Sequence, residues 1–418
     1  MSVTAPVTLV PGAFLELPLA IAAPGEAWIT VTLAAPETTW ERGEAAVVTL
    51  DVNGRARQEI ILAGGAEPTE YRRLLGRLRP ASRSLRLRLD PDLSSPAARE
   101  VTVSAVHTGC VPDADPEGLV WRHAPILHYR ALDSRLDSLT TDTPLLLFHR
   151  QVTDREGPGV EYHVVFSHED AGTDLAGLLA CWGHTTDIEW VYRVIHDETG
   201  RTIREEFQGP GHATTPFQGG RAFGGHPVLQ VATRNGCVTD RVRCPFRAAL
   251  APALKQPADE PREGVLHRFP WVYRVSALEV LRQVPLEAPP SPASPAAADS
   301  RSYLFLQWKR AAGPAPPLEA GVRVSGTWYT SAWGRPDLAM HGDDAESTAV
   351  KLPPGTTKQD VTAISLRALE PPREGVAVNL VRAFFLDPTY RPGRALPARG
   401  ACRLTAGRPQ AIVWERAG

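Results

Sequence analysis

A histidine and two carboxylates stand close together in the string GHTTDIEW at 183–190. Histidine binds borderline metals, and carboxylates bind hard cations such as Ca²⁺, Mg²⁺ and Mn²⁺. His184, Asp187 and Glu189 are therefore the candidate metal ligands. One histidine with two carboxylates favours Ca²⁺, Mg²⁺ or Mn²⁺ over Zn²⁺ as the divalent cation.

Two buried carboxylates side by side need a cation, a proton or an arginine between them. If residues 187–195 form a strand, Asp187, Glu189 and Arg193 share one face. An ion pair with Arg193 is therefore the alternative to a metal, and a turn whose carboxylates cap backbone amides is another. Further ligands or pocket residues are expected among His168, Glu169, Asp170, Asp174, His212 and His226.

These residues lie in a central region, 119–283, that holds most of the histidines of the chain. Its apolar, β-branched segments predict strands at 144–149, 161–166, 188–195, 227–233 and 271–275. The pentapeptide WVYRV occurs at 190–194 and again at 271–275, which suggests two equivalent strands. Only 173–181 predicts a helix, with Thr173 or Asp174 as its N-cap. A glycine-dense loop at 209–226 is expected to border or cover the site.

The preceding segment, 1–113, predicts a β-sandwich. Strands are expected at 27–33, 47–52, 58–62, 84–89 and 100–106. Asn53-Gly54 is a strong signal for a two-residue hairpin turn. Residues 84–89 alternate leucine with serine or arginine, which places leucine in the core and arginine in solvent.

A Pro/Ala-rich linker at 285–298 precedes a third β-rich segment, 300–418. Strands are expected there at 303–308, 321–329, 361–366 and 377–386. This segment is either an independent domain or an extension of the central sheet. The predicted fold class is mainly β, with several β-sandwich domains and little helix.

The composition excludes several classes of protein. The chain has 418 residues, 43% hydrophobic and 22% charged, with a net charge of −2, which does not suit nucleic acid. No apolar run is long enough to span a bilayer. Residues 1–26 carry no basic residue, so we expect a cytoplasmic protein, or an extracellular one if a leader has been removed. The preference for Arg, Ala and Pro is typical of a high-GC bacterial genome.

The cysteines are few, and no Cys-x-x-Cys is present, so a zinc-thiolate site is not expected. The spacing of Cys237 and Cys244 permits a disulfide across a hairpin. Reduced, buried thiols are the other interpretation.

The string Gly183-His184-x-x-Asp187-x-Glu189 resembles the Gly-His-Arg-His-Asp-Trp-Glu heptapeptide of necrosis-inducing phytotoxins (the necrosis- and ethylene-inducing peptide-like proteins). It also resembles the His-Glu-Gly-Asp-Trp-Glu motif of the vacuolar protein sorting 62-like family. The segments HAPIL at 123–127 and HPVLQVA at 226–232 are similar to further motifs of the second family.

The resemblance implies a β-sandwich with a divalent-metal site at His184, Asp187 and Glu189, and a sphingolipid-headgroup ligand. It covers at most residues 120–245. Thr186 and Ile188 replace a histidine and a tryptophan of the heptapeptide. An aspartate upstream in the phytotoxins falls near Ala176, so Asp174 or Asp170 would have to replace it.

The resulting hypothesis is a divalent-metal-binding β-sandwich protein that binds or acts on a glycan or glycolipid ligand. Trp328, Tyr329 and Trp333 are candidates for stacking on sugar rings. The alternative is a structural or protein-interaction β-scaffold without catalysis. No complete catalytic motif is present, so the sequence leaves open whether the protein is an enzyme, and it gives no oligomeric state.

Overall fold

A computed structural model describes residues 6–169, 174–257, 260–310, 315–341 and 347–416. The protein is mainly β, with 46% of residues in strands and 13% in helices, as predicted. Two compact units divide the chain. The first contains 1–170 and 187–258, and the second contains 171–186 and 259–418. No helix in the described part has the length and apolarity needed to cross a bilayer.

The first unit begins with a β-sandwich of two four-stranded sheets. The strand order of one sheet is β1 (Val7–Leu9), β8 (Val101–Pro112), β3 (Gly25–Ala34) and β6 (Thr69–Leu78). The order of the other is β2 (Phe14–Ile21), β7 (Ala81–Leu89), β4 (Val47–Val52) and β5 (Arg55–Ile61). Alternating apolar side chains of both sheets, such as Leu85 and Leu87 of β7 and Val103 of β8, meet in one core.

The Asn53-Gly54 prediction is confirmed. Both residues adopt positive φ, at 52° and 69°, and Val52 pairs with Arg55 across the turn. Positive φ at both central residues defines the hairpin turn whose twist matches the flanking strands.

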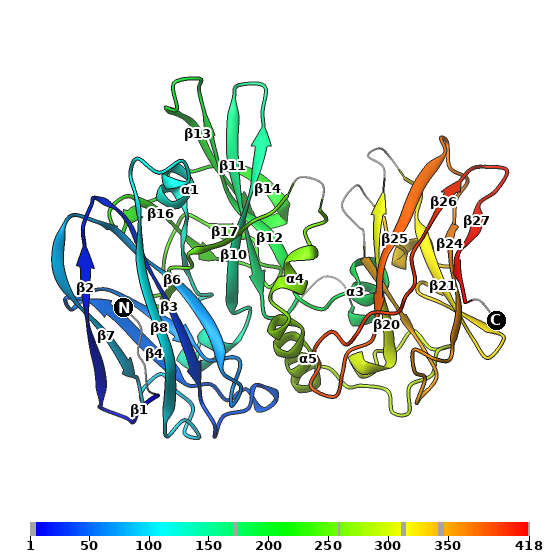
Figure 1. The fold of residues 1–418 in the computed structure, drawn as a ribbon, viewed down its shortest axis with the longest axis horizontal. Coiled ribbons are helices and arrows are strands. Elements are labelled where there is room, and N and C mark those ends of the chain that lie inside the picture. The colour runs from blue at the N-terminus through cyan, green and yellow to red at the C-terminus, as the bar shows by residue number, and fades with distance from the viewer. Residues whose placement is uncertain (1–5, 170–173, 258–259, 311–314, 342–346, 417–418) are drawn as a thin grey trace. The chain divides into compact units, whose positions relative to one another are not determined.

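The central sheet of the first unit has six strands. Their order is β14 (Ala213–Pro216), β13 (Thr202–Gly209), β12 (Ile188–His196), β11 (Pro158–Phe166), β10 (Pro144–Thr153) and β19 (Pro252–Lys255). β19 is parallel to β10, and the other neighbours are antiparallel. In Figure 1, β11, β12 and β13 run side by side.

A smaller sheet and short helices complete the first unit. The sheet contains β15 (Arg221–Ala222), β16 (His226–Val231), β9 (Ile126–His128) and β18 (Arg247–Ala248), with β17 (Val238–Thr239) on β16. The helices are η1 (Trp40–Arg42), α1 (Gly118–His123), α2 (Arg135–Thr140) and η2 (Pro210–His212). The backbone nitrogens of Leu74 and Arg77 donate to Ala249 and Phe223, which joins this region to the N-terminal sandwich.

The second unit is another pair of four-stranded sheets. One contains β23 (Ser347–Lys351), β20 (Tyr303–Arg310), β25 (Val376–Phe384) and β26 (Gly400–Leu404). The other contains β22 (Thr327–Thr330), β21 (Leu318–Val324), β24 (Val361–Ala368) and β27 (Gln410–Glu415). Leu304, Val322 and Leu366 belong to its shared core. The segment predicted as one strand, 321–329, is a hairpin, because β21 ends at Val324 and β22 begins at Thr327. Ser325 and Gly326 form the turn with positive φ.

The helices of the second unit are α3 (Leu175–Trp182), α4 (Gly264–Arg268), α5 (Trp271–Gln283), η3 (Ser300–Ser302) and η4 (Pro336–Leu338). The helix predicted at 173–181 is confirmed as α3, and the Asp174 carboxylate caps it by accepting a hydrogen bond from the backbone nitrogen of Gly177 at 2.7 Å. The strand predicted at 271–275 is wrong, because these residues begin α5. The predicted domain boundaries at 113–119 and 283–300 stay predictions.

Cys237 and Cys244 are free, buried thiols, so the hairpin disulfide is not formed. Val238 and Thr239 turn back to pair with β16, and the segments that carry the two cysteines therefore do not face each other across a hairpin.

Candidate functional site

The predicted metal ligands are divided between the two units. His184 follows α3 in the second unit, whereas Asp187 and Glu189 belong to the first. Within the described residues, no three His, Cys, Asp or Glu side chains are arranged to hold a metal ion. Asp170 lies outside the described residues. The described residues alone thus do not fit a three-ligand site, and a divalent cation at His184, Asp187 and Glu189 stays a prediction.

His184 is a buried residue that contacts Glu263. Its Nδ1 lies 2.8 Å from the carbonyl oxygen of Thr186, which can only accept, so Nδ1 carries a hydrogen. Its Nε2 lies 3.8 Å from Oε1 of Glu263. Burial by itself raises the pKa of Glu263, but His184 and Arg262 outweigh burial and hold that pKa below its usual value.

The cavity beside His184 is small. Its volume is about 10 Å³, and Thr185, Ser276 and Tyr273 are among the residues that line it. A cavity needs roughly 10–15 Å³ to hold one water. The space therefore suits at most a single water rather than a substrate, which favours a structural role for His184.

Asp187 packs beneath the turn between β16 and β17. It is 3% exposed. A Cβ on Gly236, whose φ is +63°, would lie 2.3 Å from Oδ2 of Asp187, so only glycine fits there. The Asp187 carboxylate is consequently enclosed by the protein.

Glu189 and Arg193 lie on opposite faces of β12. His163 pairs with Trp190 but Tyr162 pairs with Tyr192, so a β-bulge places Val191 as an extra residue. The predicted common face of Asp187, Glu189 and Arg193 is wrong because that bulge reverses the alternation. Arg193 does not bridge the two candidate carboxylates.

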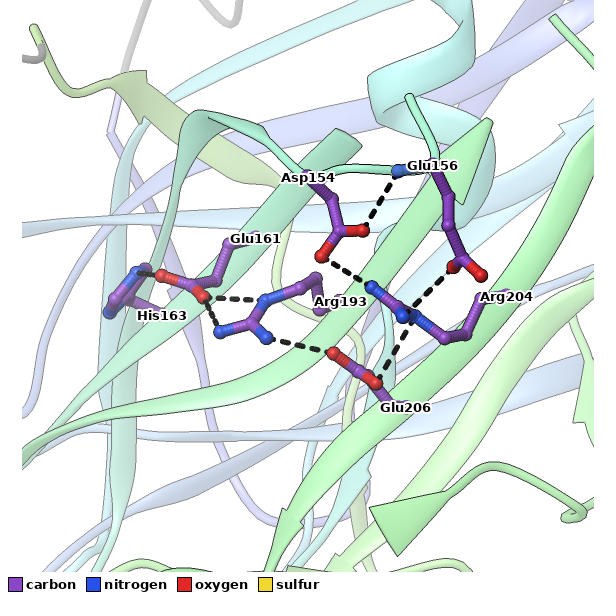
Figure 2. A network of polar contacts seen from close by, with 7 residues as sticks. All are labelled: Asp154, Glu156, Glu161, His163, Arg193, Arg204 and Glu206. Atoms are coloured by element: carbon purple, nitrogen blue, oxygen red, sulfur yellow. Dashed lines mark hydrogen bonds and ion pairs between the residues drawn. The ribbon is translucent and has the colours of Figure 1, made fainter. Parts of the chain in front are cut away.

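Arg193 is instead the centre of an ion-pair network (Figure 2). Its Nε donates to Glu161 at 2.8 Å and its Nη1 donates to Glu206 at 2.8 Å. Nε2 of His163 lies 2.8 Å from the other oxygen of Glu161. Burial alone would raise the pKa of Glu161, but His163 and Arg193 lower it to about 2.

The network continues to the edge of the sheet through Arg204. This arginine contacts Asp154 at 2.6 Å, Glu156 at 2.9 Å and Glu206 at 3.4 Å. Each carboxylate drawn in Figure 2 thus has a basic partner. The arrangement joins β11, β12 and β13 and leaves no poised acid or base, so its role is structural.

A polar cluster surrounds Glu189. Nε2 of Gln208 donates to Glu189, lies 2.9 Å from Nδ1 of His212, and lies 3.8 Å from Sγ of Cys237. Nε2 of His212 lies 3.1 Å from the amide nitrogen of Asn235. The cluster brings the predicted residues Glu189 and His212 together, 3.9 Å apart. Cys237 is 1% exposed, so its thiol is not accessible to a substrate.

His226 has a buried partner in the N-terminal sandwich. Its Nε2 lies 2.9 Å from Oε2 of Glu26, and its Nδ1 lies 2.9 Å from the carbonyl oxygen of Ala124. The side chains of His226 and Glu26 are 1% and 2% exposed. Both ring nitrogens thus have polar partners inside the protein, and neither is available to a ligand. His168 is also buried, at the end of β11, and Glu169 follows it.

Two more buried histidines of the first unit have depressed pKa values. Burial, with help from His196, lowers the pKa of His123 to about 4. Burial and the charge of Lys255 lower the pKa of His149 to about 4. These imidazoles are neutral at pH 7, so the histidine-rich composition mainly reflects the interior of the first unit.

A separate cavity lies in the first unit, and we call it the arginine–carboxylate pocket. Its volume is about 450 Å³. Its lining consists of four arginines, three carboxylates and an apolar edge: Arg57, Arg88, Arg135 and Arg247; Glu59, Asp90 and Asp92; Leu93, Pro245 and Phe246. The volume lies within the roughly 300–1,000 Å³ typical of ligand sites.

Two buried carboxylates organise this pocket. Asp90 accepts from Arg57 at 2.9 Å and from Arg88 at 3.0 Å, and Glu59 accepts from Arg57 at 3.2 Å. Glu59 and Asp90 are each 4% exposed, whereas Arg57 and Arg88 are 48% and 44% exposed. Burial raises the pKa of Glu59 although Arg57 and the backbone nitrogen of Arg247 oppose it. The guanidinium groups are therefore held in place yet accessible.

Sequence reasoning missed this pocket. The one available signal was the alternation at 84–89, which predicts an outward Arg88. The other walls come from 57–59, α2 and 245–247, which only the tertiary fold brings together.

No family model and no curated protein matches the chain. Solved structures with similar parts include the CBM36-1 domain of a multidomain xylanase from the hindgut metagenome of Trinervitermes trinervoides, at 14% identity and a TM-score of 0.19, over 25% of this chain and 77% of that one. A carbohydrate-binding module CBM36 in complex with calcium and xylotriose is 15% identical, with a TM-score of 0.18, over 24% and 78%. A ruminal GH26 endo-beta-1,4-mannanase is 13% identical, with a TM-score of 0.20, over 29% and 28%. Identities and TM-scores this low assign neither a family nor a ligand to the chain.

Proposed function

We propose that this protein binds a glycan-type ligand in the arginine–carboxylate pocket of its first unit. The observation that carries the proposal is the pair of buried carboxylates, Glu59 and Asp90, that fix accessible guanidinium groups around a cavity of about 450 Å³. A cavity of this size is large enough for a small-molecule ligand such as a saccharide unit.

The chemistry of the lining suits a polyhydroxylated ligand. Guanidinium groups present several donors in a fixed plane, and carboxylates accept hydrogen bonds. Because Arg57 and Arg88 are already held by Asp90, little side-chain freedom is lost when a ligand binds. Half-buried Phe246 supplies an apolar surface for the carbon face of a sugar ring.

The proposal requires no metal at this pocket and no catalytic step. The cation predicted at His184, Asp187 and Glu189, and the relationship to the phytotoxin and sorting-protein families, are retained as separate hypotheses. Their support is the residue pattern at 183–189, of which Asp187 and Glu189 both lie beside β11. Adding a chelator to the binding assay tests whether that cation contributes.

A glycan array probed with the full chain would identify ligands, and calorimetry on a positive ligand would test the pocket. We expect Arg88→Gln to weaken binding about tenfold or more, because a hydrogen bond to a charged group contributes roughly 1.5–3 kcal/mol. Phe246→Ala should also weaken binding, because it removes the apolar surface offered to the sugar ring. Trp328→Ala is the control, since Trp328 is an exposed indole of the second unit.

Loss of binding in Trp328→Ala with unchanged binding in both pocket variants would refute the pocket as the site. A protein that binds no glycan on the array would refute the function itself. That result would favour the alternative, a structural or protein-interaction scaffold, whose partner a pull-down would then identify.

A further inference from the structure

The arginine–carboxylate pocket contains more positive than negative groups. Four guanidinium groups face three carboxylates in its lining. Arg57 and Arg88 are matched by Glu59 and Asp90 through ion pairs of 2.9–3.2 Å. The charges of the two buried carboxylates are thus balanced by Arg57 and Arg88.

The other two guanidinium groups, those of Arg135 and Arg247, have no such partner. Among the described residues, no carboxylate lies within 4 Å of either one. Arg247 lies over the ring of Phe223 at 5.5 Å. Its backbone nitrogen donates to Glu59 at 2.8 Å, and its guanidinium charge acts on Glu59 from beyond ion-pair distance. Arg135 is exposed at the start of α2.

Asp92 is the one remaining acid of the lining. It is exposed, so water screens its charge. Its backbone nitrogen donates to Oδ1 of Asp90 at 3.1 Å, which fixes the Asp92 backbone rather than directing the carboxylate to an arginine. With every group ionised, the lining keeps one net positive charge.

We infer that the saccharide bound in this pocket carries an acidic group, a carboxylate or a sulfate, that Arg135 and Arg247 recognise. The inference rests on the proposed glycan-binding function and specifies its ligand. A planar guanidinium group matches a carboxylate or sulfate through paired hydrogen bonds. The neutral ring hydroxyls then face Arg57, Arg88 and the two buried carboxylates, which would repel an anion placed against them.

The test compares two ligands that differ only in charge. Calorimetry on the full chain would use an oligogalacturonate and the same oligosaccharide after reduction of its carboxyl groups to hydroxymethyl groups. We expect the acidic ligand to bind at least tenfold more tightly, and this difference to shrink as salt is added. Inorganic sulfate alone is a third ligand, and it should bind at least tenfold more weakly than the acidic saccharide.

Variants assign the effect to residues. Arg135→Gln and Arg247→Gln should each weaken binding of the acidic ligand more than binding of the reduced ligand, and so reduce the preference for the acidic ligand. Arg247→Gln keeps the backbone contact to Glu59. The matched control is Arg241→Gln, an exposed arginine of the same unit that does not line the pocket, and it should keep the full preference.

The outcomes separate the inference from the function on which it rests. Equal binding of the two saccharides, with both weakened by Arg88→Gln, would overturn the acidic ligand and leave the glycan-binding function intact. Sulfate that binds as tightly as the acidic saccharide would also overturn it, because the pocket would then recognise an anion alone. If neither these saccharides nor any glycan of the array binds, the proposed function fails.

Discussion

Replacement of Arg193 by methionine tests whether the network of Figure 2 stabilises the central sheet. The variant keeps much of the aliphatic volume but leaves Glu161 and Glu206, 9% and 10% exposed, without their shared guanidinium group. Removing one partner from a buried ion pair costs about 3–5 kcal/mol, because an uncompensated charge stays buried. We expect a loss at the lower end of that range at pH 7, because His163 stays beside Glu161 and Arg204 beside Glu206.

The pKa of Glu161 independently indicates how much the network contributes to the free energy of unfolding. Its folded value is about 2, compared with 4.5 for the free side chain. At about 1.4 kcal/mol per pH unit, the ionised group contributes about 3 kcal/mol of stability above pH 4.5. That contribution is lost as the pH falls from 4.5 towards 2. His163 provides part of it, and Arg193 the rest.

The wild type and Arg193→Met should differ in how their stability changes as the pH is lowered. Without the guanidinium group, the pKa of Glu161 rises, so Arg193→Met loses less stability than the wild type as the pH falls below 4.5. The difference between them should therefore shrink in acid. A triple variant, Glu161→Gln, Arg193→Met and Glu206→Gln, removes the charges together and should regain more than half of the loss.

Hydrogen exchange measured by mass spectrometry suits this test, since a chain of two compact units need not unfold in a single transition. Peptides from β11, β12 and β13 report the local opening free energy. The reasoning is refuted if Arg193→Met keeps its protection at pH 7, or if the triple variant loses as much protection as the single one.

Three further predictions concern other sites. His123 and His149 have a pKa of about 4 in the folded protein and 6.5 in the unfolded chain. As the pH is lowered from 6.5 to 4, the free energy of unfolding should therefore fall by about 1.4 kcal/mol per histidine and per pH unit, which a falling melting temperature would show. Asp187→Ala should remove a near-stoichiometric divalent cation, measured by elemental mass spectrometry. His226→Leu should cost about 3–5 kcal/mol in urea unfolding, because Glu26 stays buried without its partner.

Each of these has a clear opposing result. An unchanged pH slope in His149→Gln would contradict a neutral, buried imidazole. The absence of metal in both wild type and Asp187→Ala, after dialysis against Ca²⁺, Mg²⁺, Mn²⁺ and Zn²⁺, would contradict the cation site. If Glu26→Gln combined with His226→Leu is no more stable than His226→Leu alone, an unpaired charge is not the cause of the loss.

The strands with strict alternation could be predicted from the sequence. Residues 84–89 and the Asn53-Gly54 turn lie where their pattern places them, because the period of a half-buried strand and the left-handed turn are local properties. The helix α3 was predictable for the same reason, since Asp174 is an N-cap before an apolar segment.

The repeated pentapeptide WVYRV shows where local patterns fail. At 190–194 it lies in β12, and at 271–275 it begins α5. The sequence SALEVLRQ, rich in helix formers, follows the second copy, and residues 275–280 are all buried in α5. Five residues alone do not determine the state, because packing decides between two acceptable conformations.

The candidate sites were predictable only in part. Glu189, from the string at 183–189, and His212, one of the further candidate residues, do lie near each other. The bulge at Val191 could not be read from strand alternation, and it separates Arg193 from Glu189. The arginine–carboxylate pocket depends on segments far apart in the chain, so no spacing in the sequence reveals it.

The second unit is assembled from two stretches of chain, 171–186 and 259–418, with residues 187–258 of the first unit between them. In Figure 1, the green helix α3 lies among the yellow and orange strands of this unit. The hydroxyl of Thr348 in β23 donates to the carbonyl oxygen of Ala180 in α3, and a Cβ on Gly183 would lie 2.7 Å from the backbone nitrogen of Thr348.

This order of assembly has consequences during synthesis. At about 5–20 residues per second, β23 leaves the ribosome roughly 10–30 s after α3. Until then α3 lacks the strand against which it packs, so the second unit completes its fold only after the whole first unit has been made. A gene cut at 258 would also leave α3 on the wrong fragment. We therefore expect that fragment 259–418 is not obtained folded by simple truncation, because it lacks α3, whereas co-expression with 1–258 would supply all the parts of the second unit.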